Sequence, residues 1–519
     1  MSRKMTKNVI ETNETILSHD IGTSGCKSVL VDRHLGIVDS HFEPYPTYVP
    51  ERDWMEQDPE EWWASVCRST RTLLQRNGCH LKVKCVAITG QMMGMLPVSK
   101  TGEPLMRSVI WADLRSKEEM EQIEEMLGAE WLYQITGQPA SCGYTLPKIL
   151  WLMKHNRDIY DQTYQFLHSK DYINLKLTGN YATDHTDAAY TLCYDLHKRD
   201  WSDVVLDSCG VSADKFPRIL NSTDVVGYIT PEALQACGFA EDERIPVVAG
   251  AGDGSASHAG ALCFEKGDAY ISLGSSSWYM EVLEEPFMDP EGRLQCEPHV
   301  LPDLYMLGGT MQTGGMSYQW LKENLFADQY SHKELEDLLA KSEPGASGVL
   351  FFPFLLGERA PWANPYVRGA YMNLAYETGQ PEVVRATLEG ISYNLLAIKK
   401  LCGDARSERP MVLMGGGASN PAWVNILANI FDDHIFVPAD FRDRCSIGGA
   451  LIGFMGLEQN IDENNIDFSK WLEETEGEIY TPDASIKKRY ENIFPIWHEV
   501  ATALMTSSRK LSEVQDYIV

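Results

Sequence analysis

The stretch from Ile245 to Ser257 carries one carboxylate, Asp253, at the point where a short apolar run ends in glycines. This pattern predicts a strand, a loop and the start of a helix. An aspartate there lies at the carboxyl end of a strand, the edge at which open α/β sheets bind their ligands, and the glycines let a substrate approach the backbone. A second interpretation has equal support from the residues, because aspartate often caps a helix, here one that begins near Ser255.

Two turns far apart in the chain share one design. Residues 16–32 alternate as an apolar strand, a tight glycine turn and a second strand, which predicts a β-hairpin, and residues 269–280 repeat this pattern. Each turn taken alone is an ordinary hairpin turn, but the repeat indicates two domains of like design, each with a turn of phosphate size. The candidate phosphate contacts are Gly22, Thr23 and Ser24 in the first turn and Gly274, Ser275 and Ser276 in the second.

A carboxylate and a third glycine loop extend this set. Asp20 precedes the first turn, and an ionised carboxylate, which only accepts hydrogen bonds, suits a hard cation such as Mg²⁺ better than it suits phosphate. Gly415, Gly416 and Gly417 follow a predicted strand and leave no side chain to keep a flat ring off the backbone. The helix expected beyond them favours anions at its N-terminus. We therefore assign this loop, with Asn420, to a nucleotide.

One further loop reaches the sheet edge at which Asp253 is expected. The predicted strand 83–89 ends in residues 90–94, and Met92 and Met93 would form one wall of a substrate pocket, with Gly254 beside Asp253. Methionine more often fills a core, so the position of the loop carries this prediction. Glu358 and Arg359 in a loop either form a structural ion pair or border the substrate, and the structural interpretation is favoured because such pairs are common.

Length and composition limit the remaining choices. A chain of 519 residues indicates two large domains or three ordinary ones, and 44% hydrophobic with 23% charged residues is typical of a soluble globular protein. A net charge of -29 disfavours nucleic acid and anionic membranes as partners, and a phosphate-bearing ligand then needs local amides or a metal ion. The 12 cysteines form no C-x-x-C pair, which disfavours zinc and disulfides. Residues 1–13 lack an apolar signal core and no run is long enough to cross a bilayer, so a cytoplasmic location is expected.

Taken together, Asp20 with its turn, Asp253, the turn at Gly274 and the loop 415–417 resemble the sugar kinases of the FGGY family, within the actin-like ATPase superfamily. Residues 143–155 and 369–389 also resemble two signatures of that family, with a departure at Asn373, where glycine is usual. The resemblance implies an α/β fold of two actin-like (ribonuclease H-like) ATPase domains with a cleft between them. Residues 1–245 would bind the sugar, and residues 246–519 would bind the nucleotide and end in a helical tail. A homodimer is left open.

Within the family, xylulokinases are the most similar members, on residues 54–59, 90–92, 170–172, 198–202 and 357–359. They usually carry Met-His where this chain has Met92-Met93 and commonly Asp-Asn where it has Asp253-Gly254, so two polar contacts to sugar hydroxyls are lost. The resemblance implies ATP-dependent phosphorylation of a sugar hydroxyl, with D-xylulose to D-xylulose 5-phosphate as the first choice. Ribulose, a polyol or gluconate are alternatives, although gluconate calls for a cation that Met92 and Met93 do not offer. Glycerol kinases fit less well, since they carry Arg-Glu at these two positions.

The resemblance also implies a catalytic role for each of the candidate site residues. Asp253 accepts the proton of the sugar hydroxyl as that hydroxyl attacks the γ-phosphorus of ATP, Asp20 and Asp253 are the candidate Mg²⁺ ligands, and the two turns steady charge on the phosphoryl oxygens. The chain lacks G-x-x-x-x-G-K-[ST], which excludes a P-loop kinase. The competing class is a non-catalytic sugar sensor with the same clamp, and the presence of both Asp20 and Asp253 disfavours it.

Overall fold

Two antiparallel hairpins form the centres of two sheets. The computed structural model describes residues 14–78, 81–403, 407–458, 471 and 474–514. The first hairpin joins β1 (Glu14–Ile21) to β2 (Gly25–Asp32), and the second joins β15 (Ala269–Leu273) to β16 (Ser277–Leu283). Both predicted hairpins are therefore confirmed.

The two sheets are built alike. In the first, β1 pairs in parallel with β5, which pairs in parallel with β14; in the second, β15 pairs in parallel with β21, which pairs in parallel with β22. The first sheet has the order β13 (Val225–Tyr228), β14 (Pro246–Gly252), β5 (Lys82–Gly90), β1, β2 and β3 (Ile37–Pro44). The second has the order β17 (Gln295–Pro298), β18 (Tyr305–Met311), β16, β15, β21 (Met411–Met414), β22 (Ile435–Pro438) and β23 (Gly477–Tyr480). The shared order confirms two domains of like design.

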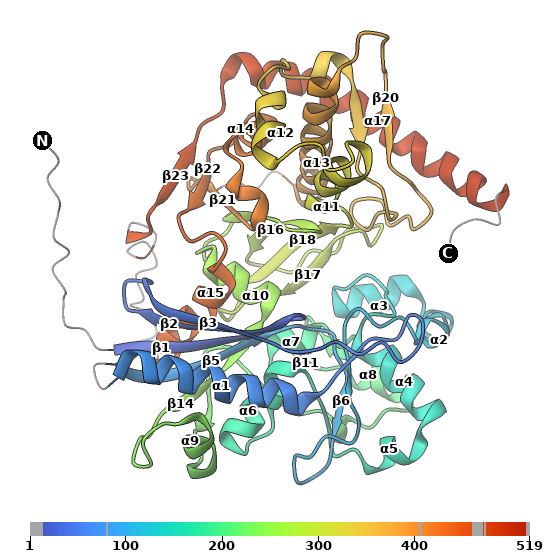
Figure 1. Cartoon of the computed structure of the whole chain (residues 1–519). Coiled ribbons are helices and arrows are strands. Elements are labelled where there is room, and N and C mark those ends of the chain that lie inside the picture. Colours follow the sequence, from blue (N-terminus) through green and yellow to red (C-terminus); the bar gives the residue numbers. More distant parts are fainter. Residues whose placement is uncertain (1–13, 79–80, 404–406, 459–470, 472–473, 515–519) are drawn as a thin grey trace, which may run out of the picture.

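Helices cover both faces of the first sheet because its side chains alternate between two cores. Leu17 belongs to the core under α1 (Pro59–Asn77), α6 (Ser169–Thr178) and α9 (Pro231–Cys237). Ile16, its neighbour, belongs to the core under α10 (Asp253–Gly260) and α15 (Arg444–Glu458). Figure 1 shows α10 and α15 between the two sheets. The second sheet is covered by α13 (Gln380–Cys402) and α14 (Pro421–Phe431).

Shorter elements fill the connections. In the first half these are β4 (Glu56–Gln57), β6 (Leu96–Val98), β7 (Ser108–Val109), α2 (Lys117–Leu127), α3 (Ala129–Thr136), α4 (Thr145–His155), α5 (Arg157–Gln162), β8 (Gln165–Leu167), β9 (Ala182–Asp184), α7 (His185–Ala189), β10 (Tyr194–Asp195), β11 (Asp200–Trp201), α8 (Asp203–Ser208) and β12 (Arg218–Leu220). In the second half they are α11 (Gly315–Trp320), α12 (His332–Leu339), β19 (Leu350–Phe352) and β20 (Ala370–Met372). None of the helices formed by the described residues combines the length and apolarity needed to cross a membrane.

The expected helical tail needs one correction. Its beginning forms β23, which adds to the edge of the second sheet by antiparallel pairing with β22. This strand depends on a partner about 40 residues earlier in the chain, which a local pattern does not reveal. The tail is helical, as expected, over α17 (Ala484–Val514), and residues 515–519 lie outside the described residues. The helix buries Trp497, whose indole N–H donates to the carbonyl of Phe351 at 2.8 Å.

The predicted division between residues 245 and 246 falls just before β14. That strand pairs with β5 in the first sheet, and α10 follows it directly and packs on β14 and α15. The chain enters the second sheet at β15, which begins at Ala269. The strand pairing therefore favours a division between residues 260 and 269, which we propose in place of the earlier position.

Candidate active site

Three parallel strands end at one edge of the first sheet. Asp20 of β1 pairs with Thr89 of β5, and Gly252 of β14 pairs with Gly90. Because parallel strands present their carboxyl ends at the same edge, this register brings together Asp20, the loop that begins at Gln91 and Asp253. The edge faces the second half of the molecule.

A cavity of about 730 Å³ lies between the two halves. Its wall includes seven predicted site residues: Asp20, Met92, Met93, Asp253, Gly254, Ser276 and Gly415. The other eight do not line it: Gly22, Thr23, Ser24, Gly274, Ser275, Gly416, Gly417 and Asn420. The structure thus brings the acceptor-side residues together, whereas five of the six predicted phosphate contacts in the two turns do not line the cavity.

Asp253 is the first residue of α10, and Gly252 occupies the N-cap position. Its Oδ1 accepts the N–H of Gly254 at 2.8 Å, so the carboxylate contacts the first turn of the helix and also borders the cavity. Burial, and then the nearby charge of Asp20, raise the pKa of Asp253 to about 7. A carboxyl with a pKa near neutrality can accept and release a proton at physiological pH.

Asp20 lies beside it, and the hydroxyl of Thr89 donates to its Oδ1 at 3.2 Å. Burial raises the pKa of Asp20, although hydrogen bonds from Thr89 and Cys445 and the charge of Lys27 oppose the shift. The ammonium of Lys27 is itself paired with Asp443. Asp20 is therefore a half-buried carboxylate with spare acceptor capacity at the cavity wall, which fits a divalent cation.

Neighbouring groups hold the first hairpin turn. The carbonyl of Thr23 accepts from Gln57 at 2.7 Å, and the indole N–H of Trp111, which lines the cavity, donates to the Thr23 hydroxyl at 3.0 Å. In the second turn, the carbonyls of Gly274 and Ser275 accept from the first turn of α11, at 2.8 Å and 3.1 Å. Both turns are braced mainly by their carbonyls, and the Thr23 hydroxyl, which accepts from Trp111, still has its own proton to donate to a ligand.

The glycine loop after β21 has two separate reasons for its composition. Gly415 has φ of +85°, and a Cβ at that position would lie 2.6 Å from the carbonyl oxygen of Leu273. A Cβ on Gly416 would meet nothing within 4 Å, so this position is open. Asn420 is the N-cap of α14 and accepts the N–H of Trp423 at 3.1 Å. Its side-chain oxygen is therefore used within the helix.

The two methionines differ in role. Met92 is only 6% exposed and packs so closely on Gly252 that a Cβ there would lie 2.4 Å from its sulfur. Met93 is less buried and has a positive φ of 66°. The ammonium of Lys148, fully buried, donates to the carbonyl of Met93 at 2.8 Å and also to that of Gly143. Lys148 thus holds two segments that line or border the cavity.

The structure does not show the favoured ion pair between Glu358 and Arg359. The Glu358 carboxylate accepts the N–H of Gln312 at 2.6 Å and the side-chain amide of Asn394 at 2.9 Å, and burial raises its pKa to about 8. Among the ion pairs of the described residues, none joins Glu358 to Arg359. Both residues line the cavity, and the guanidinium has no hydrogen bond or ion pair with another described side chain.

Sequence reasoning also missed Glu297 and Trp278. Glu297 accepts from the hydroxyl of Tyr190, and burial raises its pKa to about 7. It reaches the cavity from β17, a strand placed by tertiary pairing alone, so no local signal marks it. Trp278 also lines the cavity, and its position just after the second hairpin turn was a usable signal.

Paired sheets of this order, with carboxylates and hydroxyl-bearing turns around an interlobe cavity, define a two-domain phosphotransferase of the actin-like class. The chain matches the N-terminal domain of the FGGY family of carbohydrate kinases over residues 15–260 and the C-terminal domain over residues 269–457. It therefore belongs to the FGGY family of carbohydrate kinases, enzymes that transfer a phosphoryl group from ATP to an alcohol.

Individual relatives cover most of the chain. A xylulose kinase from Escherichia coli is 33% identical over 438 residues, which are 83% of this chain and 87% of that protein. Two crystal structures from Lactobacillus acidophilus, a gluconate kinase and a ligand-bound xylulose kinase, each superpose with a TM-score of 0.89 at 26% identity. Each comparison covers 96% of this chain and 100% of the other. The likeness confirms the predicted fold class.

Proposed function

We propose that this kinase phosphorylates D-xylulose to D-xylulose 5-phosphate, with Asp253 as the base. One observation carries the catalytic assignment: a carboxyl whose pKa is raised to about 7 borders a cavity between the two lobes. The xylulose kinases among the relatives support the choice of acceptor.

In the proposed reaction, the acceptor hydroxyl lies within hydrogen-bond reach of Asp253. Its oxygen attacks the γ-phosphorus as the bond to the β,γ-bridging oxygen breaks, and the proton passes to the Asp253 carboxylate. The amides and hydroxyls of the turns, with Gly22 and Thr23 on one side and Gly274 and Ser275 on the other, steady charge on the transferred group when the lobes close. Closure also expels water, which would otherwise compete as the acceptor.

Asp20, with Asp253 beside it, would hold the Mg²⁺ that accompanies ATP. The free acceptor capacity of Asp20 and its burial at the cavity wall support this assignment. A bound divalent cation would supply charge neutralisation for the phosphates. The glycine loop from Gly415 to Gly417 would receive the flat base of the nucleotide, at the open position of Gly416.

The Asp253→Ala variant tests the base. Sugar phosphorylation should fall by about 10²- to 10⁴-fold, the usual contribution of a positioned base, while ATP binding persists. A variant that keeps near-normal turnover with a native thermal midpoint would refute the assignment.

One observation favours a second acceptor class, the aldonates. Arg359 places an unpaired guanidinium on the cavity wall, which Tyr144 and Tyr190 of the first lobe also line. A planar guanidinium matches a carboxylate through two parallel hydrogen bonds. The cation that Met92 and Met93 do not offer can therefore come from the second lobe, and one structural relative is named a gluconate kinase.

A coupled ADP-release screen of the purified protein separates the two classes. The panel contains pentuloses, hexuloses, polyols and aldonates, each with wild type and with Arg359→Met. Preference for D-xylulose that persists in Arg359→Met supports the first proposal. Preference for an aldonate that is lost in Arg359→Met supports the second.

A further inference from the structure

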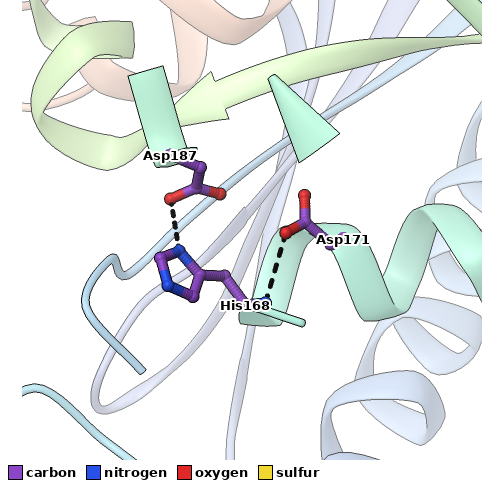
Figure 2. Close-up of side chains that lie close together, drawn as sticks. All are labelled: His168, Asp171 and Asp187. Atoms are coloured by element: carbon purple, nitrogen blue, oxygen red, sulfur yellow. Dashed lines mark hydrogen bonds and ion pairs between the residues drawn. The ribbon is translucent and has the colours of Figure 1, made fainter. Parts of the chain in front are cut away.

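A buried ionic cluster lies near the active-site edge, and its residues do not line the cavity. His168, Asp171 and Asp187 have potential ligand atoms within 4.8 Å of one another, and Figure 2 shows the two aspartates on either side of the histidine. Nδ1 of His168 lies 2.9 Å from Asp187, and its backbone N–H donates to Asp171 at 3.2 Å. None of the three is more than 4% exposed.

This cluster already contains its cation. The ammonium of Lys170, which is fully buried, lies 2.7 Å from Asp171, 3.1 Å from Asp184 and 3.3 Å from Asp187. Buried carboxylates need a positive partner, and Lys170 provides it by a hydrogen bond to Asp171 and by ion pairs with Asp184 and Asp187. We therefore look for the role of the cluster in the segments that it holds.

One arm of the cluster reaches the wall of the cavity. Nε2 of His168 lies 2.9 Å from the hydroxyl of Thr145, and that hydroxyl donates to the carbonyl of Gly94 at 2.9 Å. The next residue, Ser169, donates to the carbonyl of Gln91 at 3.1 Å. The start of α6 thus fixes both ends of the loop that carries the two methionines.

The other arm reaches the residue that precedes Asp253. Asp184, held by Lys170, accepts the hydroxyl of Thr186 at 2.7 Å, and the same Thr186 oxygen accepts the N–H of Gly252 at 3.1 Å. The donor and acceptor roles are consistent, because the carboxylate takes the hydroxyl proton and leaves a lone pair for the amide. All three groups are buried, so the bonds compete with no solvent.

We propose that Thr186 is a positioning residue for Asp253, and that Asp184 and Lys170 act through it. The relay from the ammonium to Asp184, to the Thr186 hydroxyl and to the Gly252 amide fixes the Ala251–Gly252 peptide, which lies one residue before Asp253. This inference rests on the role proposed above for Asp253. It adds that the orientation of the base depends on one acceptor atom outside the cavity.

The test is Thr186→Val, which keeps the shape of the side chain and removes that acceptor. We expect kcat to fall by about tenfold to hundredfold, the cost of a small misplacement of a reacting group, with KM values near those of wild type. Ser222→Ala is the matched control. The Ser222 hydroxyl donates to the same Asp184 oxygen at 2.7 Å, but its side chain makes no bond to Gly252. This control should keep wild-type kcat.

The outcomes separate cleanly. A loss of kcat in Thr186→Val without a loss in Ser222→Ala supports the relay, whereas equal kcat values in the two variants, or a change confined to KM, would overturn it. If Thr186→Val does not fold, the kcat values of Thr186→Ser and Thr186→Cys are compared instead. The two side chains are similar in size, and only the serine oxygen is a good hydrogen-bond acceptor for the Gly252 N–H. A slow cysteine variant beside a normal serine variant supports the relay, and equal rates contradict it. An inactive Asp253→Ala with normal Thr186→Val would reject the positioning role alone, while an active Asp253→Ala would reject the base itself.

Discussion

Replacing Asp253 with asparagine should stabilise the ligand-free protein above neutral pH, although it removes the proposed base. Burial, with the charge of Asp20, raises the pKa of Asp253 from 3.8 to about 7 in the folded protein. Between these two values the folded state holds a proton that the unfolded chain has released. The free energy of unfolding therefore falls as the pH rises through this window, and the full cost is present above pH 7.

The structure sets the size of this effect. A shift of about three pKa units, at 1.36 kcal/mol each, corresponds to about 4 kcal/mol. This is an upper limit, because Asp20 titrates beside Asp253 and because the cavity lets water screen part of the charge. Asparagine carries no charge and keeps an oxygen to accept the N–H of Gly254. We expect a gain of about 2 to 4 kcal/mol at pH 8.

The difference in the free energy of unfolding is measured by urea unfolding of wild type and Asp253→Asn at pH 8 and pH 5. The buffer contains EDTA and no nucleotide. The stability difference at pH 5 should be less than half of that at pH 8, because the wild-type carboxyl is then protonated in the folded state. Asp207→Asn, at an exposed position of α8, is the control for removing a carboxylate outside the cavity. An Asp253→Asn protein that is no more stable than wild type at pH 8 would show that the ionised Asp253 carboxylate does not destabilise the folded protein.

Three further results are expected. The kcat/KM for the acceptor at saturating ATP should fall as the pH is lowered, because protonation of the Asp253 carboxyl removes the proposed base. A bound Mg²⁺ would place the midpoint below the value of about 7 of the ligand-free site. A flat profile would exclude Asp253 as the base. Gly260→Ala would place a Cβ 2.0 Å from a backbone oxygen of α15, and this clash should destabilise the protein by about 1 to 3 kcal/mol or more and lower its thermal midpoint. Gly416→Ala is the control, because a Cβ there meets nothing within 4 Å, and it should leave the thermal midpoint unchanged. Lys148→Met removes the donor to the carbonyl of Met93 and should raise the acceptor KM more than it lowers kcat, which steady-state kinetics with varied acceptor will check.

Local patterns predicted the parts of the site that lie at strand ends. The alternation around Gly22 and Gly274 specifies hairpins, and the register of parallel strands then brings Asp20 and Asp253 to one edge without further information. The strand at the start of the tail and the carboxyl of Glu297 could not be predicted in this way, because each is positioned by a partner distant in the chain. Segments that depend on non-local pairing carry weak local signals.

The same limit applies to the glycine loop and to the arginine. Gly415 and Gly417 were interpreted as open space for a ring, yet a Cβ at either would collide with Leu273, and only Gly416 is open. For Arg359, the frequency of surface ion pairs favoured a structural role. Its carboxylate neighbour instead binds backbone amides, which sequence spacing does not reveal.

The charged side chains that line the cavity show how an acidic protein can bind an anionic ligand. All four arginines that line it belong to the second half: Arg293, Arg359, Arg442 and Arg444. Two of them are paired within their own lobe, Arg293 with Asp289 and Arg444 with Asp440, so Arg359 and Arg442 carry the positive charge that is left for a ligand. Carboxyl groups line both sides of the cavity: Asp20 and Asp253 belong to the first half, and Glu297 and Glu358 belong to the second. Burial raises the pKa of all four, which reduces their negative charge. The charge of Arg359 and Arg442 is therefore available to an anionic ligand, and a net charge of -29 does not by itself oppose its binding.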